Sequence, residues 1–261
     1  MPIKSFVKKN INRINHWKNT VTDLKPKLLA LLYHRVLPEY KKNKLNVVVS
    51  RAAFEKQLDQ LSQRYRILSM KDAASRSGGD KIRIVLTFDD GYWDNYEIVF
   101  PILKKKGIPA TFFLVTDYID GKAQFSDRRL MDKKTGQPGE FIKDRFITWG
   151  QAREMREVGM EIGSHGLSHR SLSQMTLDDA KREILDSKRI IEEKTGVACR
   201  QFSFPFGSRS DYNDELINCV KEAGYDSCLL NIHGYNHADS GDFCFKRIVM
   251  SEDTDIGYLL G

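Results

Sequence analysis

The feature that most constrains this chain is a regular alternation of short apolar runs with helical patterns. The apolar runs, which we expect to form strands, are Leu28–Tyr33, Ile82–Phe88, Ala110–Val115, Met160–Ser164, Gln201–Phe204, Tyr225–Leu230 and Phe245–Met250. Strands that alternate with helices are typical of a parallel sheet with helices packed on it. No strong linker divides the 261 residues, which suffice for one large barrel domain. We therefore predict a parallel α/β architecture of about seven strands.

Capping and turn residues place helices between these runs. Ser50 is a good N-cap for one helix, and Thr176 with Asp179 resembles a capping box for another. A further helix is expected from about Trp93 to Lys106, although Pro101 lies inside it. Because proline lacks a backbone donor and clashes with the preceding turn, we expect a kink or a late start there.

The composition is that of an ordinary globular protein, with 41% hydrophobic and 30% charged residues. No apolar run is long enough to span a bilayer and no secretory signal pattern is present, so we expect a cytoplasmic location. The four cysteines form no CxxC pair and are expected to be reduced and mostly buried. They are Cys199, Cys219, Cys228 and Cys244.

The net charge of +7 is unevenly distributed along the chain. Residues 1–46 carry eleven lysines and arginines against two acids, so the remainder is slightly acidic. A uniformly basic nucleic-acid-binding protein would not show such an uneven distribution. We therefore expect no nucleic-acid partner and assign the basic excess to the N-terminal segment.

Two adjacent carboxylates, Asp89 and Asp90, directly follow the apolar run Ile82–Phe88, and Gly91 comes next. The carboxyl ends of parallel strands build the active-site face of an α/β barrel. Neighbouring carboxylates repel each other there, and a metal ion would neutralise them directly. Gly91 would allow a sharp backbone turn close to a ligand. The alternative is an ordinary Asp–Gly turn that caps the next helix.

A pair of histidines gives a second indication of a metal site. His165 and His169, in the segment SHGLSH, are four residues apart and follow the apolar run Met160–Ser164. Neutral imidazole is a good ligand for zinc and similar ions. An isolated HxxxH pair is often structural, but together with Asp90 it offers two nitrogens and one oxygen. That set is typical of a catalytic zinc site with one position left for water.

A third motif follows another predicted strand, in the segment FSFPFGS from Phe202 to Ser208. In this order, TFDDG, SHGLSH and FPFG resemble the motifs of the polysaccharide deacetylases, carbohydrate esterase family four or the NodB-homology domain. LLYHRV, FITWGQAREMREVGMEIGSH and CFKRIV resemble the exopolysaccharide and O-antigen branch of that family. The resemblance covers nearly all of the chain after about Leu28, and it implies a distorted (β/α)7 barrel of the TIM-like kind.

The resemblance also implies a reaction and assigns roles to residues. The reaction is the metal-dependent removal of acetyl from an N-acetylated sugar of a polysaccharide or glycan precursor. Three residues would hold the metal: Asp90, His165 and His169. Asp89 would act as general base toward the attacking water. The backbone N–H at Phe206, which follows Pro205, would stabilise the oxyanion. Zinc is the expected ion, although such a site also accepts cobalt, nickel or manganese.

The sequence departs from the family pattern within two of these motifs. Gly166 replaces the usual serine or threonine of the second motif, and Phe206 replaces the tyrosine of the third. Ser203 stands where the family has an arginine that pairs with the base and tunes it. Arg247, in the segment CFKRIV, is a candidate to substitute for that arginine.

The family's Leu-x-His motif, which supplies the acid for the leaving amine, is missing. His233, in LLNIHGYNH, is the nearest candidate and His237 is second; the alternative is that both are ordinary loop histidines. His34 also follows a predicted strand, and it either lines the pocket or is structural. Tyr92, just after the aspartate pair, either stacks on a sugar ring or packs in the core.

Two other classes of function stay open. The departures in the third motif and the missing acid would also fit a carbohydrate-binding pseudoenzyme. A pure binding module, however, has no need of a base such as Asp89 beside the metal ligands. An aminosugar deformylase or an O-deacetylase would use the same metal-assisted attack of water on a different acyl group.

The N-terminal segment has the pattern of a basic amphipathic helix, so we divide the chain into 1–27 and a domain 28–261. Apolar residues recur at three- and four-residue intervals: Ile3, Phe6, Val7, Ile11, Ile14, Trp17 and Val21. Lysines and arginines lie on or beside the other face. Such a helix is typical of peripheral contact with a membrane, where an enzyme on the inner face could meet lipid-linked glycan precursors. The alternative is that its apolar stripe packs on the barrel.

Overall fold

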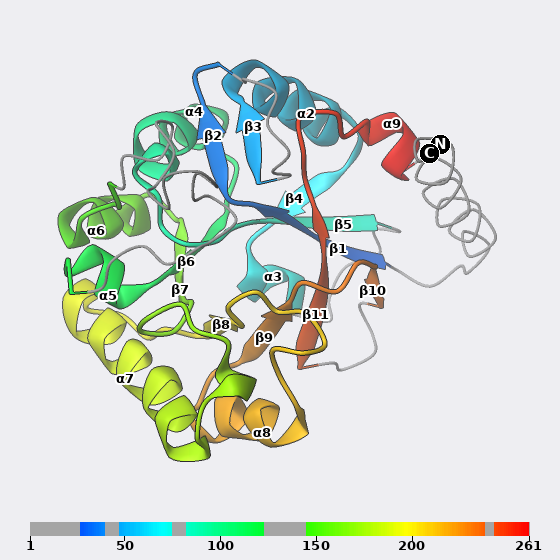
Figure 1. Cartoon of the computed structure of the whole chain (residues 1–261). Coiled ribbons are helices and arrows are strands. Elements are labelled where there is room, and N and C mark those ends of the chain that lie inside the picture. Colours follow the sequence, from blue (N-terminus) through cyan, green and yellow to red (C-terminus); the bar gives the residue numbers. More distant parts are fainter. Residues whose placement is uncertain (1–26, 40–46, 75–81, 123–144, 238–242, 261) are drawn as a thin grey trace, which may run out of the picture.

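The structure is a computed structural model, and it describes residues 27–39, 47–74, 82–122, 145–237 and 243–260. The predicted N-terminal helix lies outside the described residues, apart from Lys27, which begins the first strand. The described part is a closed barrel of strands with a ring of helices around it (Figure 1). The predicted (β/α)7 barrel is therefore confirmed.

Seven parallel strands form the barrel. They are β1 (Lys27–Tyr33), β5 (Ile82–Phe88), β6 (Thr111–Leu114), β7 (Glu161–Ser164), β8 (Gln201–Ser203), β9 (Ser227–Leu230) and β11 (Cys244–Val249). Each strand pairs with the next in this order, and β11 pairs with β1, so the sheet closes. All seven correspond to the apolar runs of the sequence, because strands of a parallel barrel are buried on both faces.

Four short strands lie outside the closed ring. They are β2 (Arg35–Leu37), β3 (Val48–Ser50), β4 (Arg66–Leu68) and β10 (Asn236–His237). β4 extends the sheet beside β5, β10 runs antiparallel to the start of β1, and β2 pairs with β3 in a separate sheet. The sequence did not predict them, because strands of two or three residues are too short to show a hydrophobic period.

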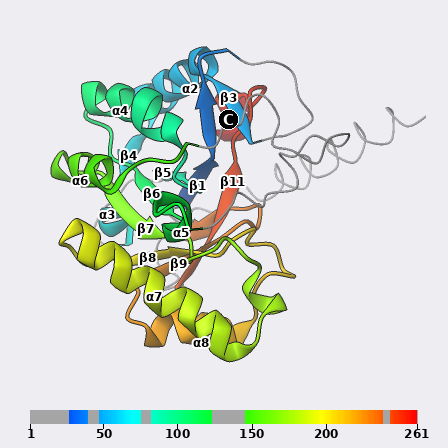
Figure 2. The same ribbon diagram turned by 60° about the vertical axis from the view of Figure 1, so that its left-hand side comes forward.

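Most helices surround the barrel, with α7 and α8 side by side along its flank, whereas α3 is seen within the ring of strands (Figures 1 and 2). They are α2 (Arg51–Arg64), α3 (Met70–Ala74), α4 (Phe100–Lys106), α5 (Thr116–Ile119), α6 (Trp149–Glu157), α7 (Leu177–Thr195), α8 (Asp214–Glu222), α9 (Ile256–Leu260) and the 3-10 helix η2 (Leu172–Gln174). As predicted, Ser50 accepts a hydrogen bond from the Ala53 N–H, and Thr176 accepts one from Asp179. None of the described helices is long and apolar enough to cross a bilayer.

The chain around Pro101 departs from a regular α-helix. A π-helix, η1 (Asn95–Val99), comes first, and α4 follows it with Pro101 in its first turn. The first turn of a helix needs no N–H from proline, because the donors there have no partner within the helix. Trp93 and Asp94 are already helical, so the helix begins where it was expected without a late start, and the irregularity before Pro101 is the π-helical stretch.

Two clusters of apolar side chains stabilise the fold. The larger lies between the strands and the surrounding helices. The smaller contains Val85, Phe113, Leu229 and Phe245 of the strands together with Met70 of α3. Side chains alternate along a strand, so Thr87 and Asp89 point into the barrel on the same side as Val85. For the same reason, Arg247 points inward like Phe245. The barrel interior therefore changes from apolar to polar toward the carboxyl ends of the strands.

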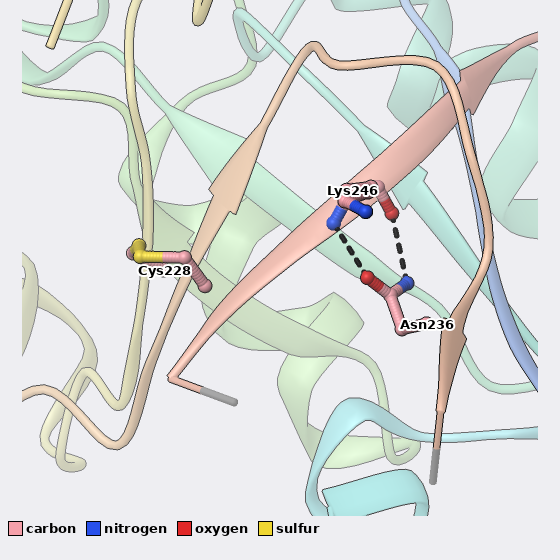
Figure 3. Close-up of a disulfide and its surroundings, with 4 residues drawn as sticks. Cys228, Asn236 and Lys246 are labelled. Carbon is pink, nitrogen blue, oxygen red and sulfur yellow. Dashed lines mark hydrogen bonds between the residues drawn. A yellow bond between two sulfur atoms is a disulfide. The ribbon is translucent and has the colours of Figure 1, made fainter. Parts of the chain in front are cut away.

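The beginning of β11 is linked to β9 on one side and, through Asn236, to β1 on the other. A disulfide joins Cys228 of β9 to Cys244, whose Cα atoms are 4.4 Å apart in the paired strands. On the other side, the Asn236 side chain donates to the Lys246 carbonyl at 3.0 Å and accepts from its N–H at 2.7 Å (Figure 3). Asn236 also donates to the Leu28 carbonyl of β1 at 3.1 Å.

The disulfide corrects the expectation of four reduced cysteines. That prediction was wrong for Cys228 and Cys244, because strand pairing places two residues that are 16 positions apart directly opposite each other. It was right for Cys199 and Cys219, which are free and buried. Burial raises the pKa of Cys199 to about 12, so this thiol stays protonated and unreactive.

Candidate active site

The candidate site lies at the carboxyl ends of the barrel strands. Asp89 and Asp90 follow β5, His165 follows β7 and is joined by His169, and Ser203 is the last residue of β8. Each of these five residues is 3% exposed or less. Parallel strands bring their carboxyl ends to the same edge, and the fold thereby gathers the predicted residues into one buried cluster.

Asp90, His165 and His169 form a group that is able to bind a metal ion. Each offers one ligand atom, and these atoms lie within 4.8 Å of one another. The Asp90 Oδ1 atom is 3.4 Å from His165 Nε2 and 3.2 Å from His169 Nε2. Although it is buried, this oxygen accepts no hydrogen bond from any of the described residues. A buried carboxylate oxygen that lacks a donor and faces two imidazole nitrogens fits a divalent cation.

The imidazole of His165 is oriented for this role by β8. Its Nδ1 atom lies 2.7 Å from the Ser203 carbonyl oxygen, which can only accept a hydrogen bond. Nδ1 therefore carries the proton, and the lone pair of neutral His165 is on Nε2, the atom that faces Asp90. A partner of this kind on the second ring nitrogen is the usual way in which proteins orient a metal-binding histidine.

The electrostatics of the cluster favour a cation. Burial would raise the pKa of Asp90, but His169 and His165 hold it well below its usual value. Burial would lower the pKa of His165, but Asp89 and Asp90 raise it. The two carboxylates thus favour a positive charge at or beside His165. A divalent ion would supply that charge and displace the proton.

Asp89 is held mainly by a buried arginine, and its Oδ2 also lies 3.6 Å from His165 Nε2. Arg247 of β11 donates to both of its carboxylate oxygens, each at 2.7 Å, and both side chains are almost fully buried. Ser203 adds a longer contact, with its Oγ 3.3 Å from Asp89 Oδ2, and itself accepts from Arg247 at 2.9 Å. Burial would raise the pKa of Asp89, but the charge of Arg247 lowers it below the usual value. Asp89 is therefore ionised and fixed in orientation.

Backbone strain is concentrated in the same cluster. Among the described residues, the non-glycine positions with positive φ are Asp90 at 76°, His169 at 56° and Phe206 at 60°. The left-handed conformation is costly for residues other than glycine and tends to occur where function requires it. Here all three positions belong to the predicted metal and oxyanion motifs, so the strain supports a functional role for this turn geometry.

The FPFG segment forms a tight loop beside the histidines. The Phe206 ring centroid is 4.8 Å from that of His169, and Pro205 in the loop is buried. Gly207 has a φ of +59°, and a Cβ there would lie 2.7 Å from the Asn231 amide nitrogen. Only glycine therefore allows the loop to approach the end of β9, where the Asn231 N–H donates to the Gly207 carbonyl at 2.8 Å.

His34 is a site residue to which the sequence gave little weight. It follows β1, is 8% exposed, and its charge contributes to lowering the pKa of Asp89 and Asp90 after the larger effects of Arg247 and His169. Asn95 donates to the His34 carbonyl at 2.8 Å. The next residue of the chain, Arg35, pairs with the buried Asp94 at 2.8 Å. In the sequence, the polar residues Asp94 and Asn95 shortly after DDG were the available indication, since they bind the segment that follows β1.

A family model described as polysaccharide deacetylase matches residues 76–228. The chain belongs to the polysaccharide deacetylase family. A candidate polysaccharide deacetylase of Bacillus subtilis (strain 168), YxkH, is 28% identical over 235 residues, which cover 88% of this chain and 74% of that protein. The poly-beta-1,6-N-acetyl-D-glucosamine N-deacetylase of Staphylococcus aureus (strain MRSA252) is 26% identical over 243 residues, covering 86% and 79%. As a member of this family, the chain described here is a hydrolase of carbon–nitrogen bonds.

Solved structures of other deacetylases share the fold of the chain described here. The Streptococcus pyogenes deacetylase PplD, in complex with acetate, aligns with a TM-score of 0.74 and 23% identity, covering 90% of this chain and 97% of that one. A de-N-acetylase from Aggregatibacter actinomycetemcomitans aligns with a TM-score of 0.70 and 21% identity, covering 89% and 98%. At these identities the likeness concerns the fold alone.

Two predicted site residues, His233 and Tyr92, have surroundings that differ from those of the buried aspartates and metal-binding histidines. His233 follows β9 as expected, but it is exposed, whereas the aspartates and metal-binding histidines are buried. Tyr92 is only 1% exposed, and its ring stacks on Phe146 at 5.5 Å between centroids. The Arg35 guanidinium lies 4.6 Å from the Tyr92 ring. Of the two interpretations left open for Tyr92, this burial favours packing in the core over stacking on a sugar.

Proposed function

We propose that the chain is a metal-dependent N-deacetylase that removes acetyl from an N-acetylated sugar of a polysaccharide or glycan precursor. The observation that carries this proposal is the buried group Asp90, His165 and His169 beside an ionised Asp89. The named activity of the Staphylococcus aureus relative supports a polymer of N-acetylglucosamine as the substrate class. Zinc is the proposed ion, with cobalt, nickel or manganese as alternatives.

The residues around the metal position divide the chemistry between them. When bound, the metal would act as a Lewis acid and bring the pKa of a water ligand toward neutrality. Asp89 then accepts the proton of the attacking water, because Arg247 keeps it ionised and leaves lone pairs on both oxygens. Because Arg247 holds both oxygens, the carboxylate cannot rotate away from the reacting water.

The oxyanion of the tetrahedral intermediate needs a hydrogen-bond donor. We propose the backbone N–H of Phe206, which the left-handed conformation of this residue orients within the FPFG loop. The loop is backed by the end of β9 through Asn231 and Gly207, so the donor is held before substrate arrives. A preorganised donor stabilises developing charge without a cost of reorganisation.

The leaving amine needs a proton, and two histidines are candidates for its donor. The sequence pointed to His233, which lies on an exposed loop after β9. The structure offers His34, which is buried and directly follows Tyr33, whose carbonyl accepts from the Asp89 N–H at 3.1 Å. We propose His34 as the donor, because a general acid must lie within hydrogen-bond reach of the reacting atoms.

The compartment and the membrane contact are further proposals. Residues 1–26 lie outside the described residues, so a membrane-binding helix and a lipid-linked substrate rest on the sequence alone. Disulfides persist mainly in oxidising compartments. The Cys228–Cys244 disulfide therefore favours a compartment outside the cytoplasm over the cytoplasmic location that we expected.

The proposed activity can be tested on defined substrates. The zinc-loaded protein is incubated with β-1,6-linked oligomers of N-acetylglucosamine, and mass spectrometry measures the loss of acetyl groups. We expect acetyl loss that stops on removal of the metal with a chelator and returns with zinc. O-acetylated and N-formylated oligomers serve as comparison substrates for an esterase or a deformylase. Acetyl loss that survives complete metal removal, or preference for either comparison substrate, would contradict the proposal.

A further inference from the structure

Glu183 is a buried acid for which the proposed reaction has no use. It lies on α7, is 5% exposed, and accepts hydrogen bonds from the segment between the two metal-binding histidines. Its Oε2 accepts from the N–H of Leu167 at 2.7 Å and of Ser168 at 3.0 Å. Its Oε1 accepts from the Ser168 hydroxyl at 2.5 Å. Burial of a carboxylate is costly unless donors surround it, and here consecutive residues of one turn supply all of these donors.

The turn that Glu183 contacts has no regular secondary structure of its own. Residues 165–169 follow β7, and their backbone groups find partners elsewhere. From the start of α5, the Thr116 N–H donates to the Gly166 carbonyl at 3.3 Å, and the Asp117 N–H donates to the Leu167 carbonyl at 2.9 Å. Glu183 and the start of α5 therefore both hold the turn, Glu183 through the turn's N–H groups and α5 through the turn's carbonyls. The turn ends at His169, whose strained φ of 56° must be maintained by such contacts.

Gly166 and Glu183 are matched to each other. Gly166 has a φ of +79°, and a Cβ at this position would lie 3.1 Å from Glu183 Oε2. That distance is shorter than an ordinary van der Waals contact. Glu183 Oε2 is also the atom that accepts from the N–H groups of Leu167 and Ser168. A Cβ at position 166 would therefore push Glu183 Oε2 by a few tenths of an ångström away from its place against the two amides. This accounts for glycine at the position where the sequence departs from the usual serine or threonine.

We propose that Glu183 is a positioning residue that fixes His165 and His169 for metal binding, and that Gly166 is required to admit it. The proposal rests on the proposed metal site and assigns a support to it. Glu183 touches neither the ligand atoms nor the reacting groups, and it acts through the backbone of Leu167 and Ser168. Hydrogen-bonded supports of metal ligands typically change metal affinity or activity by about 10–100-fold when removed.

The test measures zinc affinity of the full chain by competition with a chelator, for three variants at position 183. Glu183→Ala removes both acceptor oxygens, and we expect about 10–100-fold weaker zinc binding. Glu183→Asp keeps the charge but withdraws it from the turn, and we expect a loss in the same range. Glu183→Gln keeps one oxygen that can accept from both amides, and we expect it to retain most of the affinity. Glu193→Gln, on the exposed side of the same helix, is the matched control and should bind zinc like the unmodified chain.

The outcomes separate this proposal from the proposed function. If the unmodified chain binds no zinc, the metal site itself fails. If the unmodified chain binds zinc, and the Ala and Asp variants both bind it as tightly as the unmodified chain does, Glu183 has no positioning role. This holds even if the loss of Glu183 lowers the melting temperature. Should Glu183→Ala fail to fold, the comparison of Asp with Gln decides: a weaker Asp variant supports positioning, and equal affinity with the unmodified chain overturns it.

Discussion

Arg247 donates to both carboxylate oxygens of Asp89, each at 2.7 Å, in the interior of the barrel. Asp89 directly follows β5 and Arg247 lies on β11, and these two strands are separated by β1 in the closed sheet. The pair gives Asp89 a fixed orientation and keeps it ionised, which a general base requires. Asp90, the next residue of the chain, has no such partner and faces the histidines instead. The different partners of two adjacent aspartates are the basis of the roles that we propose for them.

Substitution of Arg247 should change the pH dependence of the reaction. Arg247 lowers the pKa of Asp89 against the opposing effect of burial. Its removal in Arg247→Ala should raise that pKa, so the base would be protonated up to a higher pH. The acidic limb of the kcat/KM profile should therefore move to higher pH. Arg247→Lys should move it less, because the charge remains while the paired hydrogen bonds are lost.

The matched control for this experiment is Lys246→Ala, since Lys246 is the exposed neighbour of Arg247 on β11. It should leave the profile unchanged. Arg247→Ala should also lower the free energy of unfolding by about 3–5 kcal/mol, because it leaves a buried carboxylate without its partner. Profiles must therefore be measured below the melting temperature of the variant. An acidic limb that stays in place in Arg247→Ala would contradict the role of this pair.

The proton donor can be identified by comparing two histidine variants. His34→Ala should lower kcat on an N-acetylated oligomer by about 10²–10⁴-fold and remove the alkaline limb of the profile. His233→Ala should have a small effect, because this residue is exposed outside the buried cluster. An activated acetyl ester, whose leaving group needs no proton, should be hydrolysed almost normally by His34→Ala. The opposite pattern, with a large loss only in His233→Ala, would return the role to His233.

The disulfide should contribute to stability in a way that reductant reveals. The double variant Cys228→Ala with Cys244→Ala should lose about 2–4 kcal/mol of unfolding free energy in urea titrations. Reductant should destabilise the unmodified chain by a similar amount and should not affect the double variant. Cys219→Ala is the control, because this thiol is free, and its response to reductant should equal that of the unmodified chain. Four reactive thiols in the unfolded, unreduced protein would show that the bond is not formed.

The sequence predicted the strands and most of the metal site because both depend on local patterns. A buried parallel strand is a continuous apolar run, and polar residues directly after it must lie at the active-site edge. Asp89, Asp90 and His165 each follow such a run, so their proximity could be inferred without coordinates. Arg247 lies inside its strand, and only the resemblance to a family drew attention to it.

The remaining features depend on which strands are neighbours and on which helix face meets which loop. Cys228 and Cys244 pair because β9 lies beside β11, and the short β10 between them in sequence lies elsewhere in the sheet. Glu183 looks like any acid of a charged helix until the packing of α7 on the turn after β7 is known. His34 gained weight only when the closure of the barrel placed β1 beside β5. Such relationships are tertiary, and no periodicity in the sequence records them.

The central claim is that Asp89 is a base and that Asp90, His165 and His169 hold the metal. Its most direct test is the parallel measurement of zinc content and acetyl release for the unmodified chain, Asp89→Asn and His165→Ala. Asp89→Asn should keep zinc at the stoichiometry of the unmodified chain and lose nearly all turnover, because a base is lost and a ligand is not. His165→Ala should lose both. Zinc that disappears with Asp89, or that stays fully bound without His165, would contradict the assignment.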